Sequence, residues 1–267
     1  MSNQEISTDQ SPLIEYKNVA VIRENHKVLK DINLSIDTGE NVAILGPNGA
    51  GKSSLIKTIT KELHPISGNG SYLRILGKEC WDVAELRNQL GIVSSDAGRS
   101  IFKDCSCSEI VLAGFFSSTG IWPHHQVTTK MKKKAEVVME LMGIYHLREK
   151  SVAAISTGES RLVMISRALI NDPKTMLLDE PTSSLDLQAT RKTRQALRRI
   201  TKKGKGIVMI THNLSDIIPE IKRVVLINNG RIIQDNEKDK ILTAESLSAL
   251  FRIKLKIIKR GGYYYCW

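Results

Sequence analysis

The sequence predicts an α/β fold in which a parallel sheet carries helices on both faces. Strand-like segments alternate along the chain with segments whose apolar residues recur at helical spacing, which is typical of parallel sheets. A glycine-rich turn joins a strand-like run to a helix-like run at residues 46–54. Helical spacing over residues 99–158 predicts a helical subdomain inserted into this core.

The individual elements follow from local patterns. Residues 1–12 are polar and predict a disordered lead. Alternating or continuously apolar runs predict strands at 13–22, 28–37, 40–46, 68–80, 91–94, 175–181, 206–213 and 223–233. Apolar residues at helical spacing predict helices near 51–63, 83–89, 106–116, 128–142, 145–150, 158–172 and 189–204. The segment 238–267 is expected to be a small extension whose last residues form a hairpin turning at Gly261 and Gly262.

The composition is ordinary for a soluble globular protein, with 41% hydrophobic and 25% charged residues. The net charge of +11 favours acidic partners without choosing among nucleic acid, anionic lipid and nucleotide. Four scattered cysteines are expected to be reduced thiols, which indicates a cytoplasmic protein. The polar, acidic first residues are not expected to act as a signal peptide, and no run of about 18 apolar residues occurs in this sequence, so any membrane work is expected to require another chain.

Residues 46–53 match the phosphate-loop pattern G-x-x-x-x-G-K-[ST]. Glycines let the backbone curl so that successive N–H groups point at an anion, and the following helix adds its positive end. Lys52 is expected to reach the β- and γ-phosphates of a nucleotide, and the Ser53 hydroxyl to reach Mg²⁺. The predicted nucleotide-binding set is Gly46, Pro47, Asn48, Gly49, Ala50, Gly51, Lys52, Ser53 and Ser54.

The run 175–181, TMLLDEP, predicts the acidic side of the same site. A buried apolar strand that ends in carboxylates can present them beside a phosphate loop. Asp179 is expected to hold Mg²⁺ through its water shell, and Glu180 to polarise an attacking water. The other interpretation of this run, a strand end with two solvated acids, is disfavoured by the phosphate loop earlier in the chain.

Between these halves lies ISTGE at 155–159, followed by a long match to what comes after the signature motif of ATP-binding cassette (ABC) ATPases. The chain resembles that family over residues 13–235, most closely its small cassettes related to molybdenum-transport and iron-complex systems. The resemblance implies a P-loop NTPase fold: a RecA-like parallel core with an antiparallel β subdomain, formed by 13–98 and 159–237, and the helical subdomain at 99–158.

The resemblance also implies a homodimer that encloses two ATP molecules with Mg²⁺. The signature of one chain would complete the phosphate site of the other through Ser156 and Gly158; Thr157 and Glu159 depart from the usual L-S-G-G-Q. Asp186 would belong to the D-loop, which crosses the dimer interface. His212 would be the switch histidine that contacts the γ-phosphate and orients Glu180.

Two positions depart from the family. Ser95 stands where a glutamine normally ligates Mg²⁺ and faces the transport partner, and it is the third candidate metal ligand after Ser53 and Asp179. Arg23 stands near the usual adenine-stacking aromatic, and its guanidinium could stack on the base. Tyr16 comes too early for that role and is expected to pack in the sheet.

These features leave several functions open. The chain is expected to be the ATP-hydrolysing subunit of a membrane transporter, at the inner face of the membrane with a permease on a separate chain. Ser95 favours the alternative, a soluble ABC ATPase that works without a permease in a non-transport role. A nucleotide-gated binding module with weak hydrolysis is disfavoured by the presence of both Glu180 and His212.

The basic helix at 189–204 is interpreted as a solvated face. Nucleic acid is not expected as a partner, because no RNA- or DNA-binding motif accompanies this helix or the aromatic tail. The transported substrate, the identity of the permease and the direction of transport leave no mark on this sequence.

Overall fold

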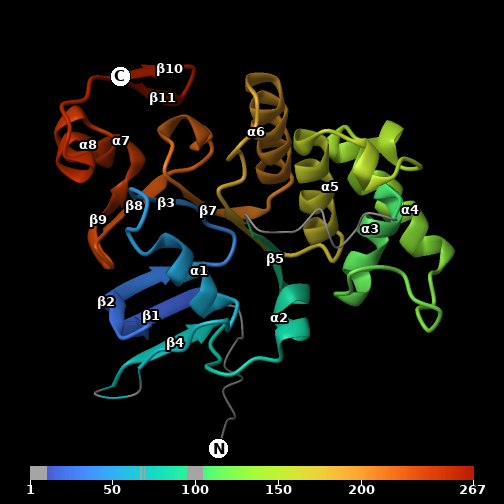
Figure 1. Cartoon of the computed structure of the whole chain (residues 1–267), viewed down its shortest axis with the longest axis horizontal. Helices are drawn as coiled ribbons and strands as arrows, with labels where there is room; N and C mark the ends of the chain where they lie inside the picture. The colour runs from blue at the N-terminus through green and yellow to red at the C-terminus, as the bar shows by residue number, and fades with distance from the viewer. Residues whose placement is uncertain (1–10, 67, 69, 95–104) are drawn as a thin grey trace, which may run out of the picture.

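The structure, a computed structural model, describes residues 11–66, 68, 70–94 and 105–267. In these residues the chain forms a six-stranded sheet, a three-stranded antiparallel sheet and a two-stranded hairpin (Figure 1). The predicted α/β class, with a mainly parallel core and an antiparallel β part, is confirmed. Ser95 and most of the predicted lead lie outside the described residues.

The six-stranded sheet has the order β5-β6-β7-β3-β8-β9. Its strands are β3 (Asn41–Leu45), β5 (Leu90–Val93), β6 (Thr175–Asp179), β7 (Gly206–Thr211), β8 (Arg223–Asn228) and β9 (Arg231–Glu237). All neighbours pair in parallel except β8 and β9. The carboxyl ends of the parallel strands therefore share one edge, where ligands bind in open α/β sheets.

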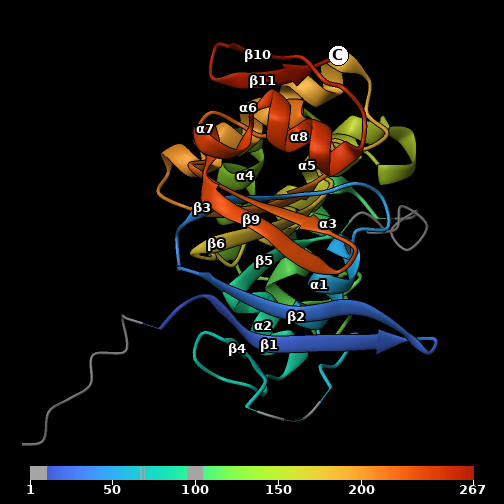
Figure 2. The same cartoon turned by 90° about the vertical axis from the view of Figure 1, so that its left-hand side faces the viewer.

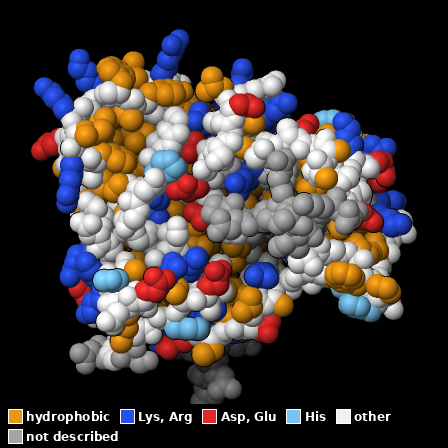
Figure 3. Space-filling model, viewed as in Figure 1, with side chains coloured by type: hydrophobic (Ala, Val, Ile, Leu, Met, Phe, Trp, Pro, Cys, Tyr) orange, Lys and Arg blue, Asp and Glu red, His pale blue; other side chains and the backbone are white. Residues whose placement is uncertain are grey.

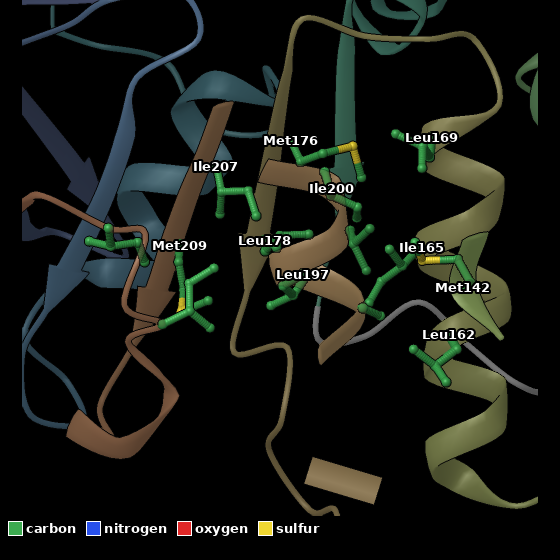
Figure 4. Close-up of a cluster of buried hydrophobic side chains, with 14 of the residues drawn as sticks. Met142, Leu162, Ile165, Leu169, Met176, Leu178, Leu197, Ile200, Ile207 and Met209 are labelled. Atoms are coloured by element: carbon green, nitrogen blue, oxygen red, sulfur yellow. The ribbon is translucent and has the colours of Figure 1, made fainter. Parts of the chain in front are cut away.

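Both faces of this sheet are covered. On β7, Ile207 and Met209 pack toward α5 (Thr157–Leu169) and α6 (Leu187–Lys202), as Figure 4 shows. The alternate residues Val208 and Ile210 pack on the other face, with α1 (Lys52–Ile59) and the antiparallel sheet. Burial on both faces explains why β7 is apolar throughout rather than alternating.

The antiparallel sheet has the order β2-β1-β4 and packs over α1. Its strands are β1 (Ile14–Arg23), β2 (His26–Ile36) and β4 (Tyr72–Ile75). The Tyr16 side chain is buried, as expected, and its hydroxyl donates to the Leu55 carbonyl oxygen at 3.1 Å. This bond joins the sheet to the helix that follows the phosphate loop.

The remaining helices before α5 are all short except α4 (Thr129–Met142), which has 14 residues. The short ones are α2 (Val83–Gln89), α3 (Cys107–Ala113), η2 (Gly114–Phe116), η3 (Tyr145–Leu147) and η4 (Val152–Ala154). The helix predicted to run to residue 63 ends at Ile59, and Lys61 has a left-handed backbone with φ +63° that a helix cannot continue through. Among the described residues, no helix combines the length and apolarity needed to cross a membrane.

The C-terminal segment packs at the opposite end of the molecule from the antiparallel sheet (Figure 2). It contains α7 (Lys238–Ile241), α8 (Ala244–Phe251), β10 (Ile257–Arg260) and β11 (Tyr263–Cys266). The predicted hairpin is confirmed: Gly261 and Gly262 have φ values of +59° and +81°, as a two-residue type I′ turn requires. The helices α7 and α8 were not predicted. The short η5 (Leu214–Asp216), which follows β7, lies beside β11.

The predicted solvated face of α6 and its exit is wrong for three basic residues, which are paired within the domain, while Arg191, Lys192, Arg199, Lys202 and Lys203 are exposed as expected. Arg194 pairs with Asp216 at 3.1 Å and Arg198 with Glu220 at 2.7 Å. Lys205 pairs with Asp172 at 2.8 Å. On the face drawn in Figure 3, Lys and Arg side chains lie in separate groups rather than in one band. A continuous cationic track for nucleic acid is not seen on that face.

Candidate functional site

A cleft of about 560 Å³ opens at the carboxyl edge of the six-stranded sheet. The phosphate loop, the β2 strand, the β8–β9 turn and the end of β6 all contribute to it. The described residues that line it are Lys27, Val28, Lys30, Asn48, Gly49, Gly51, Lys52, Ser53, Ser54, Glu180, Asn229 and Gly230.

The backbone of the phosphate loop depends on its glycines. Gly49 and Gly51 have φ values of +76° and +104°, which side-chain-bearing residues rarely adopt. Gly46 has a different constraint, because a Cβ there would lie 2.3 Å from the Ile227 carbonyl oxygen. The loop can therefore sit directly against β8 and still turn into α1.

Lys52 is the first residue of α1, and its side chain folds back over the loop. Its Nζ donates to the carbonyl oxygens of Gly46 and Pro47, both at 2.9 Å, and lies 3.9 Å from Glu180 Oε1. Burial lowers the pKa of Lys52, and the carboxylates of Glu180 and Asp179 oppose that shift. The ammonium group is thus held at the floor of the cleft among acceptors that a phosphate could replace.

The other predicted loop residues divide between the cleft and the core. Asn48, Ser53 and Ser54 line the cleft beside the loop glycines. Ala50 is buried, and its carbonyl oxygen accepts from the Gly230 N–H at 2.9 Å. Ala50 thus attaches the loop to the β8–β9 turn and does not line the cleft.

Strand β6 delivers two carboxylates to the same edge. Asp179 ends the strand and is buried, near the guanidinium of Arg161 on α5. Glu180 follows with a left-handed backbone, φ +45°, and its N–H donates to the Ile210 carbonyl oxygen at 2.8 Å. A left-handed glutamate carries backbone strain, and here it turns the carboxylate away from the strand direction and toward the cleft.

His212 lies directly after β7, the neighbour of β6 in the sheet. Its Nδ1 is 2.8 Å from Glu180 Oε1, so the two side chains share a hydrogen bond. Lys52, Glu180 and His212 therefore form one contiguous group, although they come from three separate parts of the sequence.

The signature residues lie elsewhere. Ser156 caps α5, with its hydroxyl accepting from the Glu159 N–H at 3.2 Å. Glu159 Oε2 accepts from the Ser156 N–H at 2.8 Å, and this bond lowers the pKa of Glu159. Gly158 is buried against α6, where an added Cβ would lie 2.4 Å from the Ala189 Cβ. Neither these residues nor Thr157 is among those lining the cleft.

Asp186 is also outside the cleft lining, and its carboxylate caps α6 by accepting from the Ala189 N–H at 2.8 Å. Ser95 lies outside the described residues.

Arg23 does not reach the cleft lining. It ends β1, and its Nε lies 3.2 Å from Glu24 Oε1. The reason is the strand order: β2 pairs with β1 and packs beside β9, so β2 is the strand next to the cleft. Lys27 and Val28, just beyond the turn that follows Arg23, line the cleft instead.

Sequence reasoning missed the far wall of the cleft. Lys27, Lys30 and Asn229 line it but belong to no local motif. Arg161, which lies near Asp179, was also missed. The basic residues of β2 were only a weak signal of a role in the cleft, because their place beside the phosphate loop depends on how the strands assemble.

Comparison with known proteins adds a family. Residues 29–183 match the model of the ABC transporter family. An uncharacterized ABC transporter ATP-binding protein, YlmA of Bacillus subtilis, is 29% identical over 92% of this chain and 93% of its own. The hemin import ATP-binding protein HmuV of Shewanella denitrificans is 32% identical over 86% of this chain and 90% of its own.

A solved structure agrees with these matches. The structure of cbiO1 from Clostridium perfringens, part of the ABC transporter complex cbiONQ, superimposes with a TM-score of 0.75 and 26% identity. It covers 90% of this chain and 94% of its own.

Proposed function

The chain belongs to the ABC transporter family of ATP-binding proteins, and from that membership we propose that it hydrolyses ATP to energise a membrane transporter. The observation that carries the proposal is that Glu180 lies beside Lys52 of the phosphate loop and also shares a hydrogen bond with His212. A nucleotide-binding module needs only the loop. A glutamate held by a histidine beside that loop is what hydrolysis additionally requires.

The geometry supports the following proposed roles. Loop N–H groups and the Lys52 ammonium neutralise the phosphates, with phosphate oxygens replacing the carbonyls of Gly46 and Pro47 as acceptors of Lys52. Glu180 takes a proton from water as the water oxygen attacks the γ-phosphorus and the bond to the β–γ bridging oxygen breaks. His212 fixes the orientation of the Glu180 carboxylate.

The residues also fit a magnesium ion. Ser53 offers a hydroxyl in the cleft, and the buried carboxylate of Asp179 ends the adjacent strand. Hydroxyl and carboxylate oxygens are the ligand types that Mg²⁺ prefers, alongside substrate phosphates and water. Mg²⁺ would supply charge neutralisation at the β- and γ-phosphates.

The proposal includes a dimer. Ser156 caps the helix α5 and Gly158 lies in its first turn, and neither residue lines its own cleft. They can act on a phosphate only across an interface with a second copy, as the resemblance implies. The division into a core (13–98 and 159–237), a helical subdomain (99–158) and an extension (238–267) is kept as part of this proposal.

The test is a trapped dimer. In Glu180→Gln, a protein that still binds ATP but lacks the proton acceptor, gel filtration with ATP and Mg²⁺ should shift the chain to twice its mass. The wild type should hydrolyse ATP and return to monomer. Glu245→Gln, which changes an exposed glutamate on α8, is the matched control and should behave like wild type.

Tagged Glu180→Gln recovered from cells with ATP should also carry a polytopic membrane protein. Recovery of a homodimer alone, with hydrolysis intact in the wild type, would contradict the transporter role and favour the soluble ATPase. Absence of hydrolysis under every condition would contradict the assignment of Glu180.

A further inference from the structure

The segment that carries His212 is held by a buried polar network. The Thr211 hydroxyl donates to Asp216 Oδ2 at 3.1 Å and accepts from the Asn213 N–H at 3.0 Å. Thr211 and Asp216 are both buried, so these bonds are shielded from water. Since His212 lies between Thr211 and Asn213, both of its chain neighbours are fixed by one hydroxyl group.

A guanidinium on α6 closes this network from outside. Arg194 pairs with Asp216 Oδ1 at 3.1 Å and donates to Ser215 Oγ at 2.7 Å. Only 16% of the Arg194 side chain and 4% of the Asp216 side chain are exposed. Because a buried carboxylate without its partner is costly, Asp216 is stable in this position only while Arg194 stays in place.

The C-terminal hairpin supplies the outer contact. The guanidinium carbon of Arg194 lies 5.7 Å from the centre of the Tyr263 ring on β11, within cation–π range. The residue before it, Gly262 of the turn, abuts Pro219: a Cβ added to Gly262 would lie 2.9 Å from the Pro219 Cβ. β11 thus covers the junction between α6 and η5.

The hairpin is itself fastened to the domain. Tyr264 is buried and its hydroxyl donates to Asp239 Oδ1, while Lys259 Nζ lies 2.6 Å from Asp239 Oδ2. Lys238, also buried, donates to the Pro219 carbonyl oxygen at 3.0 Å. Contacts therefore run without a break from β10–β11 through Arg194, Asp216 and Thr211 to His212, and from His212 to Glu180.

We propose that the C-terminal hairpin acts as a brace, that is, it holds the segment of His212 in position. Tyr263, Arg194 and Asp216 are the positioning residues that keep His212 hydrogen-bonded to Glu180. This rests on the proposed ATP hydrolysis. It adds that residues 257–266, which do not line the cleft, affect the rate of that reaction. A movement of the hairpin would reach Glu180 directly through His212 and the phosphate loop only indirectly, through the 3.9 Å contact of Glu180 with Lys52, so turnover would respond more strongly than nucleotide binding.

The experiment uses the full chain and compares two tyrosines of one strand. Tyr263→Ala removes the ring that covers Arg194. Tyr265→Ala, on the same strand, truncates an exposed ring and is the matched control. Tyr263→Ala should lower kcat about ten-fold with KM for ATP and the affinity for ADP within about two-fold, since small displacements of catalytic groups cost this much or more. Tyr265→Ala should leave all three quantities unchanged.

Two further variants distinguish positioning from loss of structure. Tyr263→Phe keeps the ring and should restore most of kcat. In a His212→Ala background, Tyr263→Ala should cost nothing further, because both changes act through the same histidine. A thermal melt of each variant gives its folded fraction at the assay temperature, and each kcat is calculated per folded molecule.

Three results would overturn the brace. One is a Tyr263→Ala enzyme with wild-type kcat, and another is a kcat loss that the unfolded fraction accounts for. The third is a full additional loss in the His212→Ala background. A wild type without any hydrolysis would instead contradict the proposed function, so the two failures are distinguishable.

Discussion

The phosphate loop lines the cleft and the His212 segment reaches the cleft residue Glu180, but the side chains of these two regions are held by contacts of very different sequence separation. Lys52 is fixed by the carbonyls of Gly46 and Pro47, six and five residues away. His212 meets Glu180 across 32 residues, and Asp216, which supports the histidine segment, meets Arg194 across 22. One wall of the site is therefore complete within a single motif, and the other exists only after the sheet and α6 have come together.

The difference teaches where each function is vulnerable. The proposed phosphate site consists of backbone N–H groups and one lysine, all within residues 46–54. In the proposed mechanism hydrolysis depends on the Glu180–His212 pair, and Arg194 and Asp216, which support the histidine segment, do not line the cleft. Changes that separate binding from turnover are accordingly the sharpest test of this comparison.

The largest effect is expected from Lys52→Ala. Loss of a buried ammonium that makes two charge-assisted bonds, each worth about 1.5–3 kcal/mol, should weaken ATP affinity on the order of 100-fold or more. Equilibrium binding of a fluorescent ATP analogue measures it. Lys57→Ala in the last turn of the same helix is the control. Unchanged affinity in Lys52→Ala would show that the loop, as assigned, is not the phosphate site.

His212→Ala should separate the effect on turnover from the effect on nucleotide binding. We expect kcat to fall about 100-fold, because Glu180 loses the partner that orients it, while ATP affinity stays near wild type. Steady-state hydrolysis together with nucleotide binding checks both halves of this expectation. His146→Ala, at an exposed histidine, is the control. Equal losses in binding and turnover would mean that the phosphate loop and the His212 segment do not contribute separately to these two functions.

Gly158→Ala tests a residue assigned to a partner's phosphate but buried in its own chain. The new methyl would lie 2.4 Å from the Ala189 Cβ, so α5 and α6 must move apart at a cost of about 1–3 kcal/mol in unfolding free energy. Adding Ala189→Gly opens that space and should restore stability in a denaturant titration. If stability returns and dimer-dependent hydrolysis does not, Gly158 also serves the second copy.

The smallest effect concerns pH and the hairpin. The hydrogen bonds from Lys259 and Tyr264 lower the pKa of Asp239 below its ordinary 3.8, and the bond to Asp239 raises the pKa of Lys259 above 10.5. An acid whose pKa is lower in the folded state stabilises the fold at pH values above its unfolded pKa. That contribution is lost as the pH falls through the folded pKa. A base whose pKa is higher in the folded state stabilises the fold at pH values below its unfolded pKa. That contribution is lost as the pH rises through the folded pKa.

The pair should therefore stabilise the hairpin fully between about pH 4 and 10 and progressively less outside that window. The difference in Tm between wild type and Asp239→Asn should be flat in the window and shrink below pH 3.8. Both side chains are largely exposed, so the difference will be small. A difference that persists unchanged at lower pH would show that Asp239 acts through packing alone.

Most of the fold followed from local patterns, and so did one wall of the site. The apolar runs of β3, β6 and β7 are buried on both faces, which makes them conspicuous in sequence. The turn at Gly261 and Gly262 was predictable because left-handed backbone at two successive positions favours glycine. Helix α7 escaped prediction since its four residues are too few to show a clear period. Helix α8 was also missed, although its eight residues make it as long as α1.

The parts of the site that could not be predicted depend on how strands are ordered in space. Arg23 was expected to stack on the adenine base because it lies near the position of the family's stacking aromatic residue in the chain. In the structure β2 rather than β1 adjoins the cleft. Arg194 looked like one more solvated cation on a basic helix, and its buried partner Asp216 gave no local sign of the pairing. Neither feature has a period or motif, so only the assembled structure reveals it.

The position of β3 in the sheet has a consequence for how the protein is made. Asn41 pairs with Ile207, and Val42 with Arg223, so both partners of the strand before the phosphate loop are synthesised more than 160 residues later. Until β7 and β8 emerge from the ribosome, β3 has two unpaired edges and an apolar surface, a state open to aggregation and chaperone capture. The antiparallel pair β1–β2, formed by neighbours in the chain, needs no such wait. Pulsed hydrogen exchange during refolding should accordingly protect Val21 and Leu29 before Val42 and Ile44.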